Sequence, residues 1–164
     1  MSSTLPLRLT VLCMLVFAGA ARAQHVDVVT FEQLQTMIAH PSDTTFVYNF
    51  FATWCDPCRE EFPALQKWAQ VHHADKTALV YISLDFKKSL KRALLPFLKK
   101  QNVKERVLLL DETDYNAWIN RVDSTWDGSL PMTLVVNTVR GMRRGFPRAF
   151  TFQEFQETIS PLLP

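Results

Sequence analysis

Two cysteines, Cys55 and Cys58, lie where a strand-like segment meets a helix-like segment. Residues Thr45–Phe51 are β-branched and aromatic, as in a buried strand, and residues 59–71 carry apolar side chains at helical spacing. A disulfide across so short a loop stabilises a fold only weakly. A thiolate at a helix N-terminus is instead stabilised by free backbone amides, and a second thiol nearby resolves a mixed disulfide. The spacing therefore predicts a redox pair on an α/β scaffold.

The amino terminus has the pattern of a secretory signal peptide. Arg8 precedes an apolar run over residues 9–18, and Ala21 and Ala23 are small residues of the kind that signal peptidase recognises. The run is shorter than the ~20 residues that span a bilayer. We predict that residues 1–23 are removed and that residues 24–164 form one domain in the periplasm or another extracytoplasmic space. The alternative is that the segment is retained as an N-terminal membrane anchor.

Cleavage changes both the charge and the cysteine count. The full chain has 18 Lys and Arg against 16 Asp and Glu, and residues 1–23 contain two of these cations and no acid. The mature chain then has no formal net charge, which argues against a nucleic-acid partner. Cys13 leaves with the signal peptide, so Cys55 and Cys58 are the cysteines of the mature chain.

The remaining patterns alternate between strands and helices. Strand-like runs lie at residues 78–85, 106–111, 132–137 and 142–145. Helical patterns lie at residues 31–38, 89–101, 113–122 and from 152 onward. Capping boxes open two of these helices, with Thr30 and Gln33 at one and Thr151 and Glu154 at the other. The alternation predicts parallel strands joined by crossover helices, followed by a closing hairpin.

Residues 49–63, with the sequence NFFATWCDPCREEFP, closely resemble the active-site segment of thioredoxin-like proteins. The resemblance is strongest to the exported TlpA and ResA branch, and it includes Trp54 before the first cysteine, Pro57 before the second, and Pro63. It implies a thioredoxin-like α/β fold, in which helices flank a central mixed sheet. It also implies the additional strand-helix insertion of that branch, and it calls for no metal ion or cofactor.

The family also carries a cis-proline loop that faces the cysteines. Leu130-Pro131 precedes a strand-like run in this chain and matches that loop. The resemblance implies a cis peptide at Pro131. It also implies that the backbone of Leu130 pairs with an extended substrate segment, and that Trp54 shapes the docking surface for the substrate. The alternative for Trp54 is that its side chain only packs against the fold.

The motif assigns roles to the residues around the two sulfurs. Cys55 is expected to be the exposed attacking thiolate, and Cys58 the resolving thiol one turn further into the helix. Pro57 sets the turn without leaving an amide that needs a partner. Asp56 stands where cytosolic thioredoxins have glycine, and its carboxylate disfavours a thiolate at Cys55. This favours a reducing couple.

Proton transfer at Cys58 requires an acid that the preceding strand does not provide. Thioredoxin has a buried acid there, whereas this chain has Asn49, and an amide is not a general base. Glu61 lies three residues after Cys58 and matches the acid that the exported branch carries after its motif. We predict that Glu61 relays the proton; the alternative is that Glu61 is a solvated acid on the helix surface.

Three classes of function fit a lone cysteine pair. We predict a reductant of disulfides in exported proteins, such as apocytochromes before haem attachment or copper-site proteins. An electron donor at the membrane would then recharge it. A disulfide oxidant or isomerase is an alternative, although the motif lacks the histidine that would stabilise a thiolate. A copper-binding chaperone that uses the same two cysteines is another. We expect the chain to be monomeric.

Cations are concentrated in and just before the helical pattern that follows the second predicted strand. Six of them are Lys87, Lys88, Lys91, Arg92, Lys99 and Lys100. They either form a solvated helix face or dock an acidic partner or a membrane surface.

Overall fold

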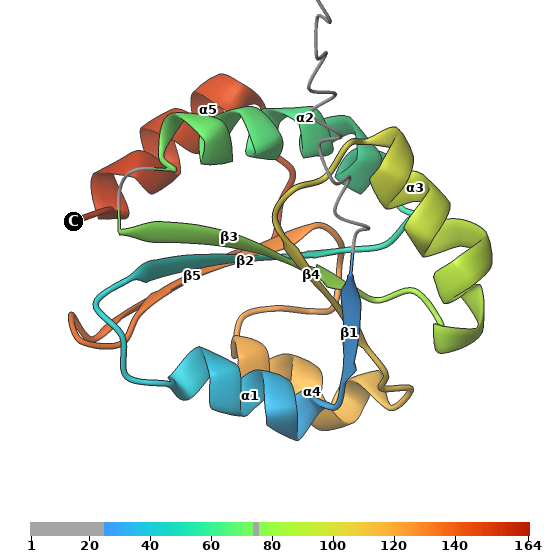
Figure 1. The fold of residues 1–164 in the computed structure, drawn as a ribbon. Helices are drawn as coiled ribbons and strands as arrows, with labels where there is room; N and C mark the ends of the chain where they lie inside the picture. The colour runs from blue at the N-terminus through green and yellow to red at the C-terminus, as the bar shows by residue number, and fades with distance from the viewer. Residues whose placement is uncertain (1–24, 74–75) are drawn as a thin grey trace, which may run out of the picture.

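A computed structural model describes residues 25–73 and 76–164 as a six-stranded sheet between two layers of helices (Figure 1). The predicted signal peptide, residues 1–23, lies outside the described residues. The strands are β1 (Val26–Val29), β2 (Thr45–Phe51), β3 (Thr77–Ser83), β4 (Arg106–Leu110), β5 (Met132–Asn137) and β6 (Met142–Phe146). Their order across the sheet is β1-β4-β3-β2-β5-β6. The first four strands in this order are parallel, and β5 and β6 continue the sheet antiparallel. The sheet is therefore mixed, as the resemblance implies.

The helices divide between the two faces of the sheet (Figure 1). The α-helices of the described residues are α1 (Phe31–Ala39), α2 (Asp56–Val71), α3 (Leu95–Lys100), α4 (Tyr115–Val122) and α5 (Phe152–Ile159). One face is covered by α2, α3 and α5, and the other by α1 and α4. Both predicted capping boxes are confirmed, at Thr30 and Thr151.

The central strand β2 contributes to both halves of the core because successive side chains of a strand point to opposite faces. Val47 and Phe51 pack in the cluster under α2, α3 and α5. Tyr48 and Phe50 pack in the cluster under α1 and α4. With both faces covered, β2 is apolar almost throughout, and its carboxyl end is held rigidly where the chain turns toward Cys55.

The helix predicted over residues 89–101 is instead three short segments. A 3₁₀ turn over Lys87–Ser89 and a π-helical turn over Leu90–Leu94 precede α3. Pro96 has no backbone N–H, and its ring would collide with the carbonyl of Arg92 in a regular helix. The wider π turn removes that collision, so the proline accounts for the break.

Among the strands that the structure describes, β1 alone is not predicted by the sequence patterns. Its four residues pair in parallel with β4, from Val26 opposite Val107 to Val29 opposite Leu110. It is an edge strand whose second and third residues are polar or exposed. So short a segment acquires its conformation from its neighbour in the sheet.

Candidate active site

Cys55 and Cys58 form a disulfide at the amino-terminal end of α2, with an S–S distance of 2.07 Å. Cys55 is the N-cap residue of α2, and the backbone N–H of Cys58 donates a hydrogen bond to Cys55 Sγ at 3.2 Å. The same amide is available to a thiolate at that position in the reduced protein. The helix therefore presents a donor to the sulfur that is expected to attack.

Cys55 is more buried than predicted. Its exposed fraction is 6% and that of Cys58 is 0%. Both sulfurs belong to the apolar cluster that includes Ala52, and Leu130 packs against that cluster. The disulfide is therefore almost completely buried, and the small exposed part of it belongs to Cys55.

The turn into α2 is fixed by backbone hydrogen bonds. The Cys55 N–H donates to the carbonyl of Ala52 at 3.1 Å, and the Arg59 N–H donates to the carbonyl of Cys55 at 3.1 Å. Pro57 is exposed at the second position of the helix, where no amide donor is needed.

Asp56 is exposed and its carboxylate pairs with Arg59, with Nη2 and Oδ1 at 2.7 Å. The guanidinium offsets the negative charge that the sequence places next to Cys55. Conversely, Arg59 is the cation of the motif nearest in sequence to Cys55, and its charge is paired with the Asp56 carboxylate. The pair as a whole adds little net charge beside the disulfide.

Asp85, which the sequence patterns did not single out, holds the loop before Cys55. Its buried carboxylate accepts hydrogen bonds from the Thr53 N–H at 3.1 Å and from the Thr53 hydroxyl at 2.6 Å. It also accepts one from the Ser83 hydroxyl at 2.8 Å. Asp85 follows β3, and the loop follows β2. Because these strands are parallel neighbours, their carboxyl ends meet at one edge of the sheet, and this adjacency was the signal that could have identified Asp85.

Pro131 stands beside the carboxyl end of β2, and its peptide bond with Leu130 is cis, as predicted. In the antiparallel register Phe50 pairs with Met132, so the next residue of β2, Phe51, lies opposite Pro131. Pro131 is buried, whereas Leu130 is half-buried. The register brings the proline loop to the end of the strand from which the cysteine turn departs.

Trp126 and Gly128 shape the approach to this loop. The indole N–H of the buried Trp126 donates to the carbonyl of Ser129 at 2.7 Å. Gly128 adopts a φ of 90°, which side chains other than glycine rarely tolerate. Trp126 is a core aromatic, and it additionally positions the residue before Leu130.

Glu61 is a buried acid on α2 and not a solvated one, with an exposed fraction of 2%. It lies three positions after Cys58, which places both on one side of the helix. Glu61 Oε1 accepts from Asn49 Nδ2 at 2.9 Å, and Oε2 accepts from the Phe150 N–H at 3.1 Å. Asn49 also donates to Thr133 Oγ1 at 3.2 Å. Burial raises the pKa of Glu61 to about 7, although the hydrogen bonds from Asn49 and Phe150 oppose the rise.

Trp54 extends into solvent beside the disulfide. Its side chain is 62% exposed, so it does not serve to fill the core. A large exposed aromatic next to a reactive sulfur is a typical contact residue for a protein or peptide.

No group of three or more His, Cys, Asp or Glu side chains is placed to share a metal ion within residues 25–73 and 76–164. Over the same residues, no helix combines the length and apolar character needed to cross a membrane.

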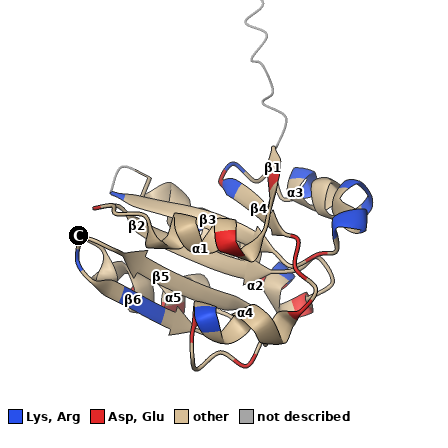
Figure 2. Ribbon diagram, turned by 90° about the horizontal axis from the view of Figure 1, so that it is seen from below, with Lys and Arg blue, Asp and Glu red and all other residues tan. Residues whose placement is uncertain are grey.

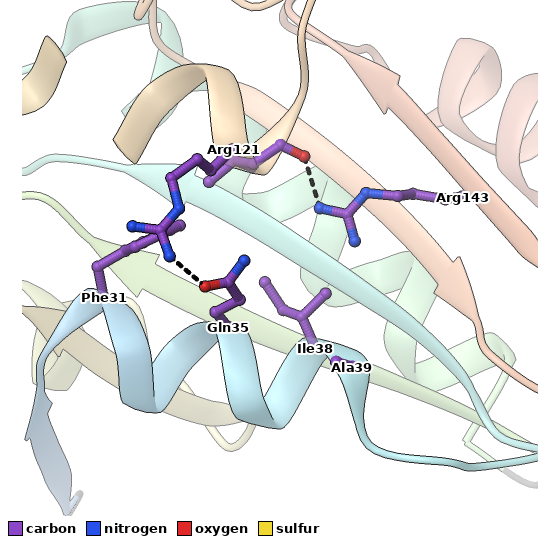
Figure 3. A pocket seen from close by; sticks show the side chains of 7 residues that line it. Phe31, Gln35, Ile38, Ala39, Arg121 and Arg143 are labelled. Carbon is purple, nitrogen blue, oxygen red and sulfur yellow. Dashed lines mark hydrogen bonds between the residues drawn. The ribbon is translucent and has the colours of Figure 1, made fainter. Parts of the chain in front are cut away.

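A small pocket lies on the other face of the sheet, between α1 and α4 (Figure 3). Arg121 and Arg143 reach it, but Arg121 donates to the Gln35 amide oxygen and Arg143 to the carbonyl of Val122. The sheet separates this pocket from α2 and the disulfide (Figure 1). It is therefore not part of the cysteine site.

The chain resembles known proteins in both sequence and fold. A family model described as the AhpC/TSA family matches residues 23–142. The thioredoxin-like protein YneN of Bacillus subtilis (strain 168) is 35% identical over 72 residues, which cover 44% of this chain and 41% of that protein. The match thus spans about two fifths of the length of this curated relative.

Solved structures share the fold at low sequence identity. The crystal structure of a thioredoxin-related protein from Neisseria meningitidis serogroup B superposes with a TM-score of 0.61 and 24% identity, over 73% of this chain and 85% of that one. StoA from Bacillus subtilis superposes with a TM-score of 0.53 and 18% identity, over 71% of this chain and 82% of that one. These similarities confirm the thioredoxin-like fold predicted from residues 49–63 and Pro131.

Proposed function

The chain belongs to the AhpC/TSA family of thioredoxin-like proteins, and on that premise we propose that it is an exported thiol-disulfide oxidoreductase that reduces disulfides in extracytoplasmic proteins. The observation that carries the proposal is the Cys55–Cys58 disulfide at the start of α2, with the acid Glu61 buried on the same side of that helix. Neither a bound metal nor a cofactor is required by this chemistry.

The reaction is a two-electron exchange between the Cys55–Cys58 dithiol and a substrate disulfide. In the reduced protein the Cys55 thiolate attacks one sulfur of the substrate disulfide, breaks that S–S bond and forms a mixed disulfide. The departing substrate thiolate takes up a proton. Cys58 then loses its proton and attacks the sulfur of Cys55, which closes the Cys55–Cys58 disulfide and releases the second substrate thiolate. That thiolate takes up a second proton, equal to the one that Cys55 lost when it ionised, so two electrons and two protons pass to the substrate in total.

We assign to Glu61 the role of accepting the proton that Cys58 loses. A carboxyl with a pKa of about 7 is partly ionised near neutral pH, so it takes up a proton from a thiol and gives it back at the same pH. Glu61 is three residues from Cys58 on one helix, and Asn49 and the Phe150 amide hold its two oxygens. Burial favours the neutral form of Glu61. That form does not repel a thiolate at Cys58, whereas an ionised carboxylate does.

The charges around Cys55 support the reducing direction. A couple is oxidising when its thiolate is strongly stabilised, because the reduced form is then favoured. Here Arg59 pairs with Asp56 at 2.7 Å, so its charge is largely offset beside the sulfur. The motif residues Asp56 and Pro57 provide no further cation.

The substrates we propose are disulfide-containing exported proteins, among them apocytochromes and copper-site proteins. The substrate segment would lie extended along the backbone of Leu130 beside Pro131 and contact Trp54. A dithiol carrier at the membrane would return the two electrons after each turnover. Nucleic acid has no part in this chemistry.

The reduction potential of the Cys55–Cys58 couple tests the direction. The protein is equilibrated with mixtures of oxidised and reduced dithiothreitol, and the dithiol fraction is measured by alkylation. We expect a potential near that of thioredoxin, about −270 mV, whereas about −120 mV would make the protein an oxidant. A Cys55→Ser variant serves as the control, since it has no couple to titrate.

A further inference from the structure

Two aromatic side chains are exposed among the described residues, and both lie at the active-site edge of the sheet. Trp54 is 62% exposed and Phe86 is 53% exposed. Each follows directly after one partner of the Thr53–Asp85 hydrogen bonds, which join the loops after β2 and β3. Trp54 and Phe86 therefore emerge from adjoining loops next to Cys55.

The chain that continues from Phe86 is strongly basic. Residues 86–104, here called the basic segment, contain seven Lys or Arg and no Asp or Glu. Its cations lie along α3 and the turns that precede it (Figure 2). For a chain with a formal net charge of only +2, this is a marked separation of charge. A local positive field of this kind attracts anionic groups despite the low net charge.

The basic segment runs from the active-site edge toward the opposite edge. It leaves the carboxyl end of β3 and returns to the amino end of β4, and these two strands are parallel neighbours. Lys87, Lys88, Lys91 and Arg92, here called the basic face, are exposed in its first two turns. Lys99 and Lys100 are exposed near its far end. The basic face thus adjoins Phe86, and Lys88 Nζ lies 5.4 Å from the centre of the Phe86 ring.

The apolar side of the basic segment is already occupied. Leu94 and Leu98 are buried in the core, and Phe97 packs against Phe51 and Phe62 with ring centres 6.0 and 5.1 Å apart. Apart from Phe86, no large apolar side chain of this segment is exposed, so little remains to enter a lipid bilayer. Within the basic face, Lys87 pairs with Asp111 at 2.7 Å, whereas Lys88, Lys91 and Arg92 are exposed, and Lys88 lies over the Phe86 ring.

We propose that the basic face binds an acidic segment of the disulfide-bearing substrate and holds that substrate over Cys55. This inference rests on the proposed function and adds to it the chemical class of the substrate: polypeptides with Asp or Glu next to the disulfide. Attraction between the acidic segment and the cations raises the rate of encounter, and it weakens as salt screens the charges.

Two peptides of equal length with the same intramolecular disulfide provide the test. One has Asp and Glu beside the disulfide, and the other has Asn and Gln at the same positions. The full mature protein is first reduced, and the rate of peptide reduction is measured at low and high salt. We expect about tenfold faster reduction of the acidic peptide at about 0.01 M salt and no difference at about 1 M, where the Debye length is about 3 Å.

Matched charge reversals locate the effect. In K88E/R92E the preference for the acidic peptide is lost, while the rate with the neutral peptide is unchanged. K99E/K100E makes the same change of charge at the far end of the same segment and retains the preference. Equal rates for the two peptides with the unaltered protein overturn the inference, and so does an equal loss in both variants, which would reflect net charge alone.

Two other outcomes can be distinguished from substrate selection: binding of the basic face to a membrane, and absence of the redox activity. Membrane binding is measured by sedimentation with vesicles of phosphatidylcholine and phosphatidylglycerol. If the unaltered protein sediments with them, K88E/R92E does not, and neither peptide is preferred, the basic face binds a membrane and the inference is overturned. If the reduced protein reduces neither peptide, the proposed function itself fails. If it reduces both equally, the function stands and only the substrate class is wrong.

Discussion

Glu61 is the residue whose protonation the fold alters most clearly at the site. Burial raises its pKa from the ordinary value of 4.5 to about 7. Between these two pH values the native state keeps a proton that the unfolded chain has lost. The contribution of this carboxyl to stability is therefore greatest below about pH 4.5 and falls as the pH rises to about 7, by about 3 kcal/mol in total.

Glu61→Gln removes this pH dependence because the amide does not ionise. We expect the difference in unfolding free energy between the variant and the unaltered protein to shift by about 3 kcal/mol in favour of Gln between pH 4 and pH 8. Urea unfolding of both proteins in the disulfide form measures it. A difference that stays constant with pH would show that Glu61 titrates normally.

The same substitution tests the proton relay. With Glu61 as the acceptor, the rate at which Cys58 reacts with an alkylating agent has an inflection near pH 7 that reflects the carboxyl. In Glu61→Gln this inflection is lost, and a single titration of the thiol remains. The measurement uses Cys55→Ser as the background so that only Cys58 reacts. An unchanged profile removes Glu61 from the mechanism.

Asn49 tunes Glu61 from the neighbouring strand. Its amide donates to Glu61 Oε1, which favours the ionised form and lowers the pKa. Asn49→Ala removes that donor, so we expect the pKa of Glu61 to rise by about one unit. Carbon-13 NMR of the labelled carboxyl follows the titration. Thr133→Val, which removes a partner of Asn49 and not of Glu61, is expected to have a smaller effect.

At the scale of residues, the sequence predicts those site residues that lie close to one another along the chain. Cys55, Cys58 and Glu61 lie within seven consecutive residues at the start of one helix, so the motif identifies them together. The partners of Glu61 come from β2 and from the loop before α5, 12 and 89 positions away. Only the folded chain brings those groups to the carboxyl, so spacing does not reveal them.

At the scale of elements, the link between the ends of β2 and β3 positions the cysteine turn. Asp85→Ala leaves the amide and hydroxyl of Thr53 and the hydroxyl of Ser83 without their acceptor. Unsatisfied buried donors are costly, so we expect a loss of about 2–4 kcal/mol in unfolding free energy by urea titration.

Asp43→Ala is the matched control for this prediction. Asp43 is also a carboxylate with a hydrogen-bonded partner, Lys76, but both side chains are exposed. Its removal is expected to cost at most about 1 kcal/mol. Equal losses in the two variants would mean that Asp85 contributes no more than a surface ion pair does.

Elements with strong periodic patterns are predicted from the sequence, and the others are altered by their neighbours. β2 and β5 match their predicted bounds because each is a continuous run of strand-forming residues. The helix predicted over residues 89–101 has helical periodicity throughout, yet Pro96 interrupts its hydrogen bonding. The spacing of apolar side chains carries no information about the backbone N–H that Pro96 lacks. The π turn was therefore not predicted.

At the scale of the whole molecule, the functional residues lie at one edge of the sheet, and the two layers of helices cover its faces. The cysteine turn, the Asp85 loop and the start of the basic segment all follow the carboxyl ends of β2 and β3. The proline loop reaches the same edge because β5 is antiparallel to β2. Residues scattered from Asn49 to Phe150 thus meet through topology, which sequence patterns indicate only through resemblance to a known fold.

The predicted signal peptide carries the prediction of where the protein lies in the cell. If Ala23 ends a signal peptide, the mature chain begins at Gln24, two residues before β1, and the sheet remains intact. Expression of the full chain in a bacterium is then expected to yield a periplasmic protein whose mass lacks residues 1–23 and whose thermal unfolding matches that of directly expressed residues 24–164.

Ala23→Phe is the control for this prediction, because signal peptidase requires a small residue before the cleaved bond. The variant is expected to keep its full mass and to remain in the membrane fraction, held by the apolar run over residues 9–18. Full mass and membrane retention of the unaltered chain would support the anchored alternative. The disulfide would still face the extracytoplasmic side in that case, so the redox chemistry and the location are tested separately.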